Sequence, residues 1–368
     1  MRLLRNSLFM RLRYLALSLL FLSSVSQGIA QTQLGGSSTY NFLELPVSAR
    51  SAALGGNFIT TRDGDLSLAL ENPSILDSSV NNKVVMSYMP YFAGINYGFF
   101  SYAHSIKAMG YDKAAGTFAV SVKYIDYGTF TQADDNGNIT GTFWAGEYMA
   151  NVGYGQAIKD STFNAGVNAK VIYSHLQQYT STGVALDVAG SYVSKNRRLF
   201  ISAVVENMGS QITDYVPGNN EPLPFDVKVG IADKLAHAPF RFGVTLDHLE
   251  HWDITYIDPA DTETVNPLTG QAVKTSSLGT FADKLMRHVT PNLELVLGPN
   301  FMIRVAYNYE VRKELESSVK QGLVGFSTGV GIRIYKFQLN YGLGWYYTTG
   351  PTSTLTLGLS LDQFYTRR

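Results

Sequence analysis

The dominant pattern along the chain is alternation of apolar with polar or small residues. Between residues 301 and 309 the odd positions carry large apolar or aromatic side chains, namely Phe301, Ile303, Val305, Tyr307 and Tyr309. The even positions carry Met302, Arg304, Ala306 and Asn308. The same alternation recurs in 117–124, 240–247, 337–345 and 354–361. A period of two predicts β-strands with one apolar face and one polar or small face.

About fourteen such strands are expected from the alternation and the turn residues between them. They lie near 84–91, 94–104, 116–127, 143–158, 161–175, 181–193, 197–207, 224–235, 239–249, 289–297, 300–310, 323–334, 336–346 and 353–361. From the fourth strand on, tight turns alternate with long connections. The tight turns are Lys159-Asp160, Lys195-Asn196, Ala236-His237, Gly298-Pro299 and Tyr335, and the long connections are 208–223, 250–288, 311–322 and 347–352.

Short turns at one end and long loops at the other are typical of a membrane barrel, whereas alternation alone also fits a soluble sandwich. An even number of strands closes the sheet and leaves no unpaired edge in lipid. The fold class we predict is therefore all-β: a transmembrane antiparallel β-barrel of about fourteen strands, with an N-terminal plug-like segment.

The composition agrees with a barrel. The 368 residues include 23 Tyr, 20 Phe and 34 Gly, and only 16% are charged. After the first 30 residues, no stretch is apolar for the ~18 residues that a membrane helix needs. The absence of cysteine excludes disulfides, thiolate metal sites and a lipidated bacterial N-terminus.

The first 30 residues have the form of a secretory signal peptide. Arg2, Arg5, Arg11 and Arg13 precede an apolar run from Tyr14 to Leu22, and Gly28-Ile29-Ala30 suits signal peptidase. Without those four arginines, 25 basic residues face 29 acidic ones, a formal charge of −4. We therefore expect an outer-membrane protein with lipid as its surroundings and no nucleic acid as a partner.

Residues 31–83 lack long strands. Small residues dominate 48–54, Gly55-Gly56 interrupts them, and 65–73 resembles a short capped helical turn. This segment is expected to be either a plug inside the barrel or an arm on the periplasmic side. The predicted organisation is thus signal peptide 1–30, N-terminal plug or periplasmic segment 31–83, and barrel 84–368.

The longest insertion contains one amphipathic helix. Helical spacing of apolar residues predicts it over 276–288, after the turn-rich 258–270. Its apolar side chains are the candidate partner-contact residues of the chain: Leu278, Phe281, Leu285 and Met286.

Two motifs resemble sites of chemistry but fit a barrel better. Gly325–Gly329 matches the G-x-S-x-G nucleophile pattern, yet a strand continues after it where that mechanism needs a helix. Asp134–Asn138 resembles part of a calcium loop, but it lacks the closing Glu, and its Asn-Gly is a strong hairpin-turn signal. We interpret the glycines of Gly153-Tyr154-Gly155, Gly329-Val330-Gly331 and Gly342-Leu343-Gly344 as strand positions where the wall packs closely.

The densest ionisable cluster is Asp247–Asp253. In a strand, His248 and Glu250 would share a face, and a hydrolase on the barrel rim could use them. A polar strand end that enters a solvated loop explains them better, with Trp252 in the interfacial aromatic belt. We therefore expect no catalytic residues, no cofactor and no metal, and we expect function to survive replacement of His248 and His251 by Ala.

Several stretches together resemble a known family. They are 38–56, Leu66–Ala69, Glu71-Asn72-Pro73, Gly116-Thr117-Phe118, Tyr124–Phe130, Gly141–Tyr148, Lys170–Ser174, Phe281–His288 and Tyr307–Leu315. They look like PorQ proteins of the type IX secretion system, and the opening motif is shared in part with PorV proteins. The resemblance implies a barrel similar to FadL-type fatty-acid transporters and a role in the cell-surface attachment complex with PorU, PorV and PorZ. In that complex PorQ tethers PorZ, and secreted cargo is joined to lipopolysaccharide.

Three functions stay open at this point. The first is a tethering barrel of the type IX system with a PorZ-like partner. The second is a FadL-like channel for hydrophobic solutes, which a kinked strand or a lateral hole would favour. The third is a rim hydrolase built on 247–253.

Overall fold

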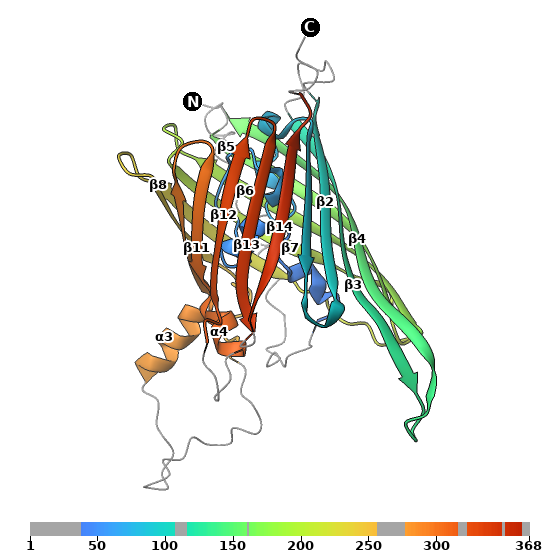
Figure 1. The fold of residues 1–368 in the computed structure, drawn as a ribbon. Helices are drawn as coiled ribbons and strands as arrows, with labels where there is room; N and C mark the ends of the chain where they lie inside the picture. Colours follow the sequence, from blue (N-terminus) through green and yellow to red (C-terminus); the bar gives the residue numbers. More distant parts are fainter. Residues whose placement is uncertain are drawn as a thin grey trace, which may run out of the picture. The chain divides into compact units, whose positions relative to one another are not determined.

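The structure is a computed structural model that describes residues 38–106, 116–159, 162–255, 277–315, 322–347 and 350–362. The predicted signal peptide, 1–30, and the turn-rich 258–270 lie outside these ranges. Within them, fourteen antiparallel strands form one closed barrel in which sequence neighbours pair and β1 pairs with β14. Figure 1 shows the closed wall and a chain segment inside it.

The strand bounds follow the predicted segments closely. They are β1 Lys83–Pro90, β2 Asn96–Ser105, β3 Gly116–Ala133, β4 Ile139–Lys159, β5 Phe163–Leu176, β6 Tyr179–Val193, β7 Leu199–Thr213, β8 Asp226–Lys234, β9 Phe240–Leu246, β10 Val289–Val296, β11 Phe301–Tyr307, β12 Phe326–Ile334, β13 Phe337–Tyr347 and β14 Gly350–Ser360. The predicted barrel of about fourteen strands is confirmed.

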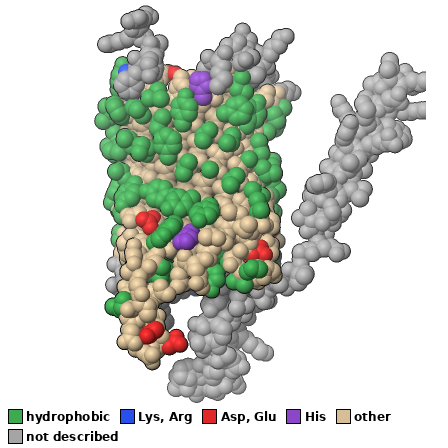
Figure 2. All heavy atoms as spheres, turned by 90° about the vertical axis from the view of Figure 1, so that its right-hand side faces the viewer, with side chains coloured by type: hydrophobic (Ala, Val, Ile, Leu, Met, Phe, Trp, Pro, Cys, Tyr) green, Lys and Arg blue, Asp and Glu red, His purple; other side chains and the backbone are tan. Residues whose placement is uncertain are grey.

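The apolar face of each strand points out of the barrel. Along β11, Phe301, Ile303 and Val305 are exposed while Arg304 and Ala306 are buried. The same division holds along β14, where Leu355 and Leu357 face outward. Figure 2 shows apolar side chains spread over one side of the wall, with the few acidic and histidine side chains toward its ends. An apolar exterior around a polar interior is the reverse of a soluble sandwich and fits a wall in lipid.

The longest hairpin extends past the predicted strand ends. We expected strands at 116–127 and 143–158, but β3 has 18 residues and β4 has 21. Figure 1 shows this hairpin reaching beyond its neighbours. Both faces of its tip are exposed, so the tip lacks the alternation that predicted the rest. Asp134–Asn138 forms the predicted turn, in which the Asp134 carboxylate accepts from the Asn136 and Asn138 amides.

Other boundaries also differ from the prediction. Strand β7 runs to Thr213, where the sequence predicted a strand end at 207. The expected long connection at 347–352 is short, because β13 runs to Tyr347 and β14 starts at Gly350. The expected strand to 310 ends at Tyr307, and helix α4, Tyr309–Leu315, follows. Asn308 caps this helix, since its Oδ1 accepts from the Val311 amide at 3.0 Å.

Residues 38–82 form the plug-like N-terminal segment. Its short helices are η1 Asn41–Glu44, α2 Ala49–Ala53, η2 Leu66–Leu68, η3 Pro73–Ile75 and η4 Ser78–Val80. Side chains of Ser48, Asp65, Asn72 and Asp77 cap the last four. Capping satisfies backbone amides locally, which lets a segment without long helices or strands be buried.

Contacts with inward-facing strand residues place this segment inside the barrel. The Ala49 amide donates to Thr356 Oγ1 at 2.8 Å. On the opposite wall, Asn168 Nδ2 donates to the Leu70 carbonyl at 2.9 Å. We call residues 38–82 the plug from here on. The two contacts join this segment to β14 and to β5.

Wall glycines let the plug approach the strands. A Cβ on Gly166 would lie 2.2 Å from the Pro73 carbonyl carbon, and one on Gly342 would lie 2.3 Å from the Ala49 oxygen. One on Gly155 would lie 2.5 Å from the Pro73 oxygen. These glycines sit where the backbone of the plug comes close. Gly155 and Gly342 are among the strand glycines expected at close-packed positions, whereas Gly166 was not named from the sequence.

A buried ion cluster joins the plug to the wall. Arg50 of α2 pairs with Asp63 at 2.8 Å, with Asp65 at 3.2 Å and with Glu294 of β10 at 3.0 Å. Glu294 also pairs with Arg304 at 2.9 Å and with Arg241. Three guanidinium groups therefore share one wall carboxylate, and removal of that carboxylate would leave buried positive charge without its counter-ion.

We predict that Glu294→Gln lowers the free energy of unfolding by roughly 3–5 kcal/mol, because it removes one partner of a buried ion cluster. The midpoint temperature at which the compact form unfolds in SDS gels measures this. The matched control is Asp253→Asn, which breaks the exposed Lys284–Asp253 pair and should change stability by at most about 1 kcal/mol. Equal midpoint temperatures for the two variants would contradict the idea that the buried ion cluster stabilises the attachment of the plug to the wall.

We predict that Gly166→Val loosens the plug without opening the barrel. Its side chain would meet the Pro73 backbone, and overpacking of this kind costs about 1–3 kcal/mol. Protease should then cut near Asn72-Pro73 while the wall stays intact. Gly190→Val is the control, since nothing lies within 4 Å of a Cβ there. Protection of Asn72-Pro73 in both variants would argue against close contact at Gly166.

Candidate functional site at the loop end of the barrel

The long connections gather at one end of the barrel. Helix α3, Ser277–Arg287, lies between β9 and β10, and α4 lies between β11 and β12. Figure 1 shows both helices at the same end, opposite the tight turns such as the one between β12 and β13. We call this the loop end and the other the turn end.

Helix α3 presents an exposed apolar face. Leu278 is 76% exposed and Phe281 is 52% exposed, and Leu285 and Met286 are about two-fifths exposed. The predicted helix is confirmed, and these four side chains, named from the sequence, are accessible. Their role in binding a partner remains a prediction.

Polar contacts fix the other side of α3. The Tyr309 hydroxyl of α4 donates to Asp283 at 2.6 Å, and Lys284 pairs with Asp253 at 2.6 Å. Trp252, which we expected in an interfacial aromatic belt, lies with its ring centroid 5.5 Å from that of Phe281. The helix is thus held by its polar side, so its apolar side is left outward.

A charged cluster lies at the same end. The sequence predicted a strand through His248, but β9 ends at Leu246 and His248 has φ +52°. The structure still brings His248 and Glu250 together at 3.4 Å, with Asp226 3.9 Å and Glu310 3.8 Å from the imidazole. Asp247 is separate, buried and bonded to Asn57 of the plug at 2.6 Å. His251 is exposed.

The donor atoms of Asp226, His248 and Glu250 lie within 4.8 Å of one another, close enough to surround a cation. The imidazole, however, already has three carboxylate partners. Burial lowers the pKa of His248, but its hydrogen bond to Glu250 and the Glu310 and Asp226 charges raise it to about 11. With the imidazole protonated beside these carboxylates, the cluster as it stands is an internal ion pair.

The same contacts argue against a rim hydrolase. In the described part of the chain, the ionic partners of His248 are carboxylates rather than a nucleophile. Ser327 of the G-x-S-x-G match lies in β12 and donates to the Ala53 carbonyl at 3.1 Å. It lies in a strand, as the sequence indicated, and the structure adds its contact with the plug.

A cavity of about 460 Å³ opens near the start of the plug. It is lined by tyrosines and carboxylates from distant segments: Tyr40, Tyr127, Tyr179, Tyr215, Glu147 and Glu221. Most of the hydroxyls are bonded inside the protein, for example Tyr127 to Glu147 at 2.6 Å and Tyr215 to Ser174 at 2.5 Å. Sequence reasoning missed this cavity because no motif links its residues.

One wall irregularity bears on solute passage. Glu206 and Asn207 of β7 face the single residue Asp187 of β6, which is a β-bulge. The freed Asn207 amide donates to Asp187 at 2.9 Å, and Lys170 bonds Asn207 Oδ1 at 2.8 Å. Polar side chains therefore provide hydrogen-bond partners for the backbone amide that the bulge leaves without a partner in the sheet.

The closed antiparallel wall, its apolar exterior and its plugged polar interior define an outer-membrane β-barrel. Among the described residues, no helix is long and apolar enough to cross a membrane.

No protein-family profile matches the sequence, and no curated protein sequence matches it. Similar solved structures include the TodX monoaromatic hydrocarbon channel deltaS2 mutant, at 12% identity over 84% of this chain and 96% of that chain, with a TM-score of 0.46. A Pseudomonas aeruginosa FadL homologue matches at 8% identity over 85% and 98%, with a TM-score of 0.43. Outer membrane phospholipase A from Escherichia coli matches at 8% over 83% and 96%, with a TM-score of 0.27. Similarities this low carry no argument about function.

We predict a pH-dependent contribution of His248 to stability. Its pKa is raised, so its ion pairs stabilise the fold fully below the unfolded value near 6.5 and are lost as pH rises through about 11. His248→Gln should therefore lower the free energy of unfolding by about 2 kcal/mol at pH 6, and the difference should disappear above pH 11. Thermal unfolding in detergent measures this. His251→Gln, at an exposed position, should match the native protein throughout, and a His248 effect that persisted above pH 11 would refute the ion-pair origin.

Proposed function

We propose that this protein is an outer-membrane barrel that tethers a soluble surface protein through helix α3. We further propose that it is a PorQ-type component of the type IX secretion system, with a PorZ-like partner in the PorU/PorV attachment complex. The observation that carries the tethering role is the combination of a plugged lumen with an exposed apolar helix at the loop end.

The filled interior favours a structural role over passage of solutes. Plug residues such as Leu54, Phe58 and Leu66 are almost completely buried inside the wall. Asp63 and Asp65 belong to the plug, so opening a path by moving the plug would separate Arg50 from the wall carboxylate Glu294. Moving a buried guanidinium away from its partners is costly, so the plug is suited to stay in place.

Helix α3 has the features of a binding surface. A soluble partner needs an apolar anchor at the centre of its interface and polar groups around it. Leu278 and Phe281 supply exposed apolar side chains, and Lys284 and Asp283 lie on the polar side of the same helix. Lipid-facing strands cannot reach a soluble protein, so the loop end is where such a partner would bind.

The PorQ part of the proposal is supported by the sequence resemblance. In the structure, the resembling stretches have defined roles: Ser48 caps α2, Arg50 anchors the plug, and Asn72 caps η3. The stretch 281–288 covers the C-terminal part of α3 and the residue after it, and 307–315 includes all of α4. The resembling stretches therefore include both the plug and the proposed tether.

The competing function is a FadL-like channel for hydrophobic solutes. The bulge at Asp187 and Asn207 is the wall feature that favours it, since a kinked strand could admit a solute from the side. Its polar network, with Lys170 and Asp187 paired at 2.8 Å, offers charges rather than an apolar path. We therefore rank this function second.

The test is the double variant Leu278→Ser/Phe281→Ser. Loss of two exposed apolar anchors should weaken partner retention at least about tenfold, since each hot-spot side chain contributes on the order of 1–2 kcal/mol or more. Affinity isolation of the barrel from solubilised outer membrane measures the retained partner, and surface attachment of secreted cargo reports the function.

The matched control is Ile139→Ser/Phe130→Ser on the β3–β4 hairpin at the same end, where Ile139 is 75% exposed and Phe130 is 42% exposed. It should leave both readouts unchanged. Normal partner retention in the α3 variant would refute the tether. Normal cargo attachment together with lost uptake of a hydrophobic solute in a deletion strain would replace it with the channel.

A further inference from the structure

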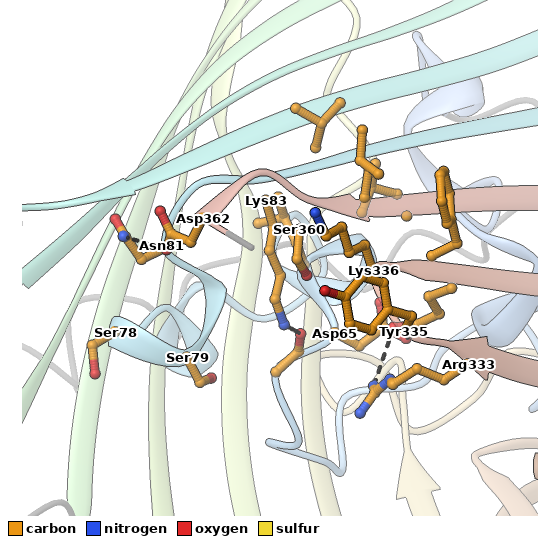
Figure 3. A pocket seen from close by; sticks show the side chains of 18 residues that line it. Asp65, Ser78, Ser79, Asn81, Lys83, Arg333, Tyr335, Lys336, Ser360 and Asp362 are labelled. Atoms are coloured by element: carbon orange, nitrogen blue, oxygen red, sulfur yellow. Dashed lines mark hydrogen bonds between the residues drawn. The ribbon is translucent and has the colours of Figure 1, made fainter. Parts of the chain in front are cut away.

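A second cavity lies at the turn end, away from α3. It has a volume of about 280 Å³ and lies where the first strand, the last strand and the β12–β13 turn meet the plug. Lys83 of β1 pairs in register with Ser360 of β14 there. Figure 3 shows the charged and hydroxyl side chains that surround it.

Three basic side chains line this cavity, namely Lys83, Arg333 and Lys336. Lys83 Nζ donates to the Gly64 carbonyl at 2.6 Å, and Arg333 donates to Gln338 Oε1 at 3.1 Å. Among the described residues, neither Lys83 nor Arg333 forms an ion pair. An ammonium has three donors and a guanidinium has five, so both cations keep donors for a ligand.

The acidic side chains of the cavity are already engaged. Asp65 pairs with Arg50 at 3.2 Å and accepts from Gln338 Nε2 at 3.0 Å. Asp362 accepts from Asn81 at 2.9 Å and from Asn82. Arg50 neutralises Asp65, whereas the neutral amides leave the negative charge of Asp362 in place. Three cations against that one carboxylate give the cavity lining a net positive charge.

The remaining lining shows which anion would fit. Ser78, Ser360 and Asn81 bring further polar groups to the cavity. A guanidinium, an ammonium and hydroxyls together match the several oxygens of a phosphate group.

The cavity also reaches the outer face of the wall. Val84, Phe337 and Leu359 belong to its lining and alternate with the inward positions of their strands. Phe337 is exposed on the exterior. Lys336 lies 5.2 Å from the ring centroid of the exposed Tyr335, an arrangement typical of the membrane–water interface.

We propose that this cavity binds a phosphate group. The phosphate can come from a phospholipid headgroup at the membrane surface or from a soluble phosphate. The apolar outward lining suits the acyl chains that accompany a headgroup, and the basic side chains suit either source. This cavity is separate from helix α3, so an experiment can refute the phosphate site without refuting the proposed tether, and the reverse.

The experiment compares the full barrel with Arg333→Gln/Lys336→Gln in two arms. In the first, native mass spectrometry counts phospholipid retained from outer membrane. In the second, delipidated protein in detergent is titrated with inorganic phosphate and followed by phosphorus NMR. Loss of two charge-assisted contacts should reduce binding at least about tenfold in the arm that holds the true source. The single variant Lys336→Gln, at a surface turn, should give a smaller loss in the same arm.

The matched control is Lys195→Gln/Arg198→Gln, which removes two exposed charges from the β6–β7 turn at the same end. It should retain native binding, and all variants should show the native gel shift on heating. Loss in the lipid arm alone assigns a headgroup, and loss in the phosphate arm assigns a soluble ligand. No binding in either arm, or equal loss in the control, overturns the proposal.

Discussion

The structure depends on the buried contact between Arg50 and Glu294. A guanidinium without solvent must keep its counter-ions, and here two lie in the plug and one in the wall. Glu294 in turn balances Arg241 and Arg304, which point into the lumen from neighbouring strands. Plug and wall therefore neutralise each other's buried charges. Arg50 of the plug pairs with Glu294 on the inner face of β9–β11, and Glu294 is a counter-ion of Arg50.

Period-two alternation was enough to predict the wall because lipid selects one face of every strand. Phe301 and Ile303 face outward and Arg304 faces inward, as their spacing indicated. The pattern failed where that selection is absent. At the tip of the β3–β4 hairpin both faces meet solvent, so alternation disappears although pairing continues to Ala133. Helix α4 was missed because Tyr307 and Tyr309 continue the strand period across a residue that caps a helix.

The candidate sites were predictable only where one segment carries them. Helix α3 shows helical spacing within eleven residues, so its apolar side chains could be named from the sequence. The ion cluster joins residues more than two hundred positions apart, and nothing near Arg50 indicates Glu294. The proposed phosphate cavity combines plug residues with residues of the first and last strands. These two strands become neighbours only when β1 pairs with β14. Closure of the barrel, a long-range event, creates that site.

A plug held this way also determines where function can reside. Plug side chains such as Leu54 and Phe58 occupy the lumen, and the strand exterior faces lipid, so both are committed to the fold. Only the two ends contact water. At the loop end, polar bonds from Asp283 and Lys284 hold α3 and leave Leu278 and Phe281 exposed, so these side chains are accessible to the partner that we propose. At the turn end, basic side chains surround a cavity beside the lipid face. The two proposed sites therefore lie at opposite ends of the barrel, and binding at either end would not require the plug between them to move.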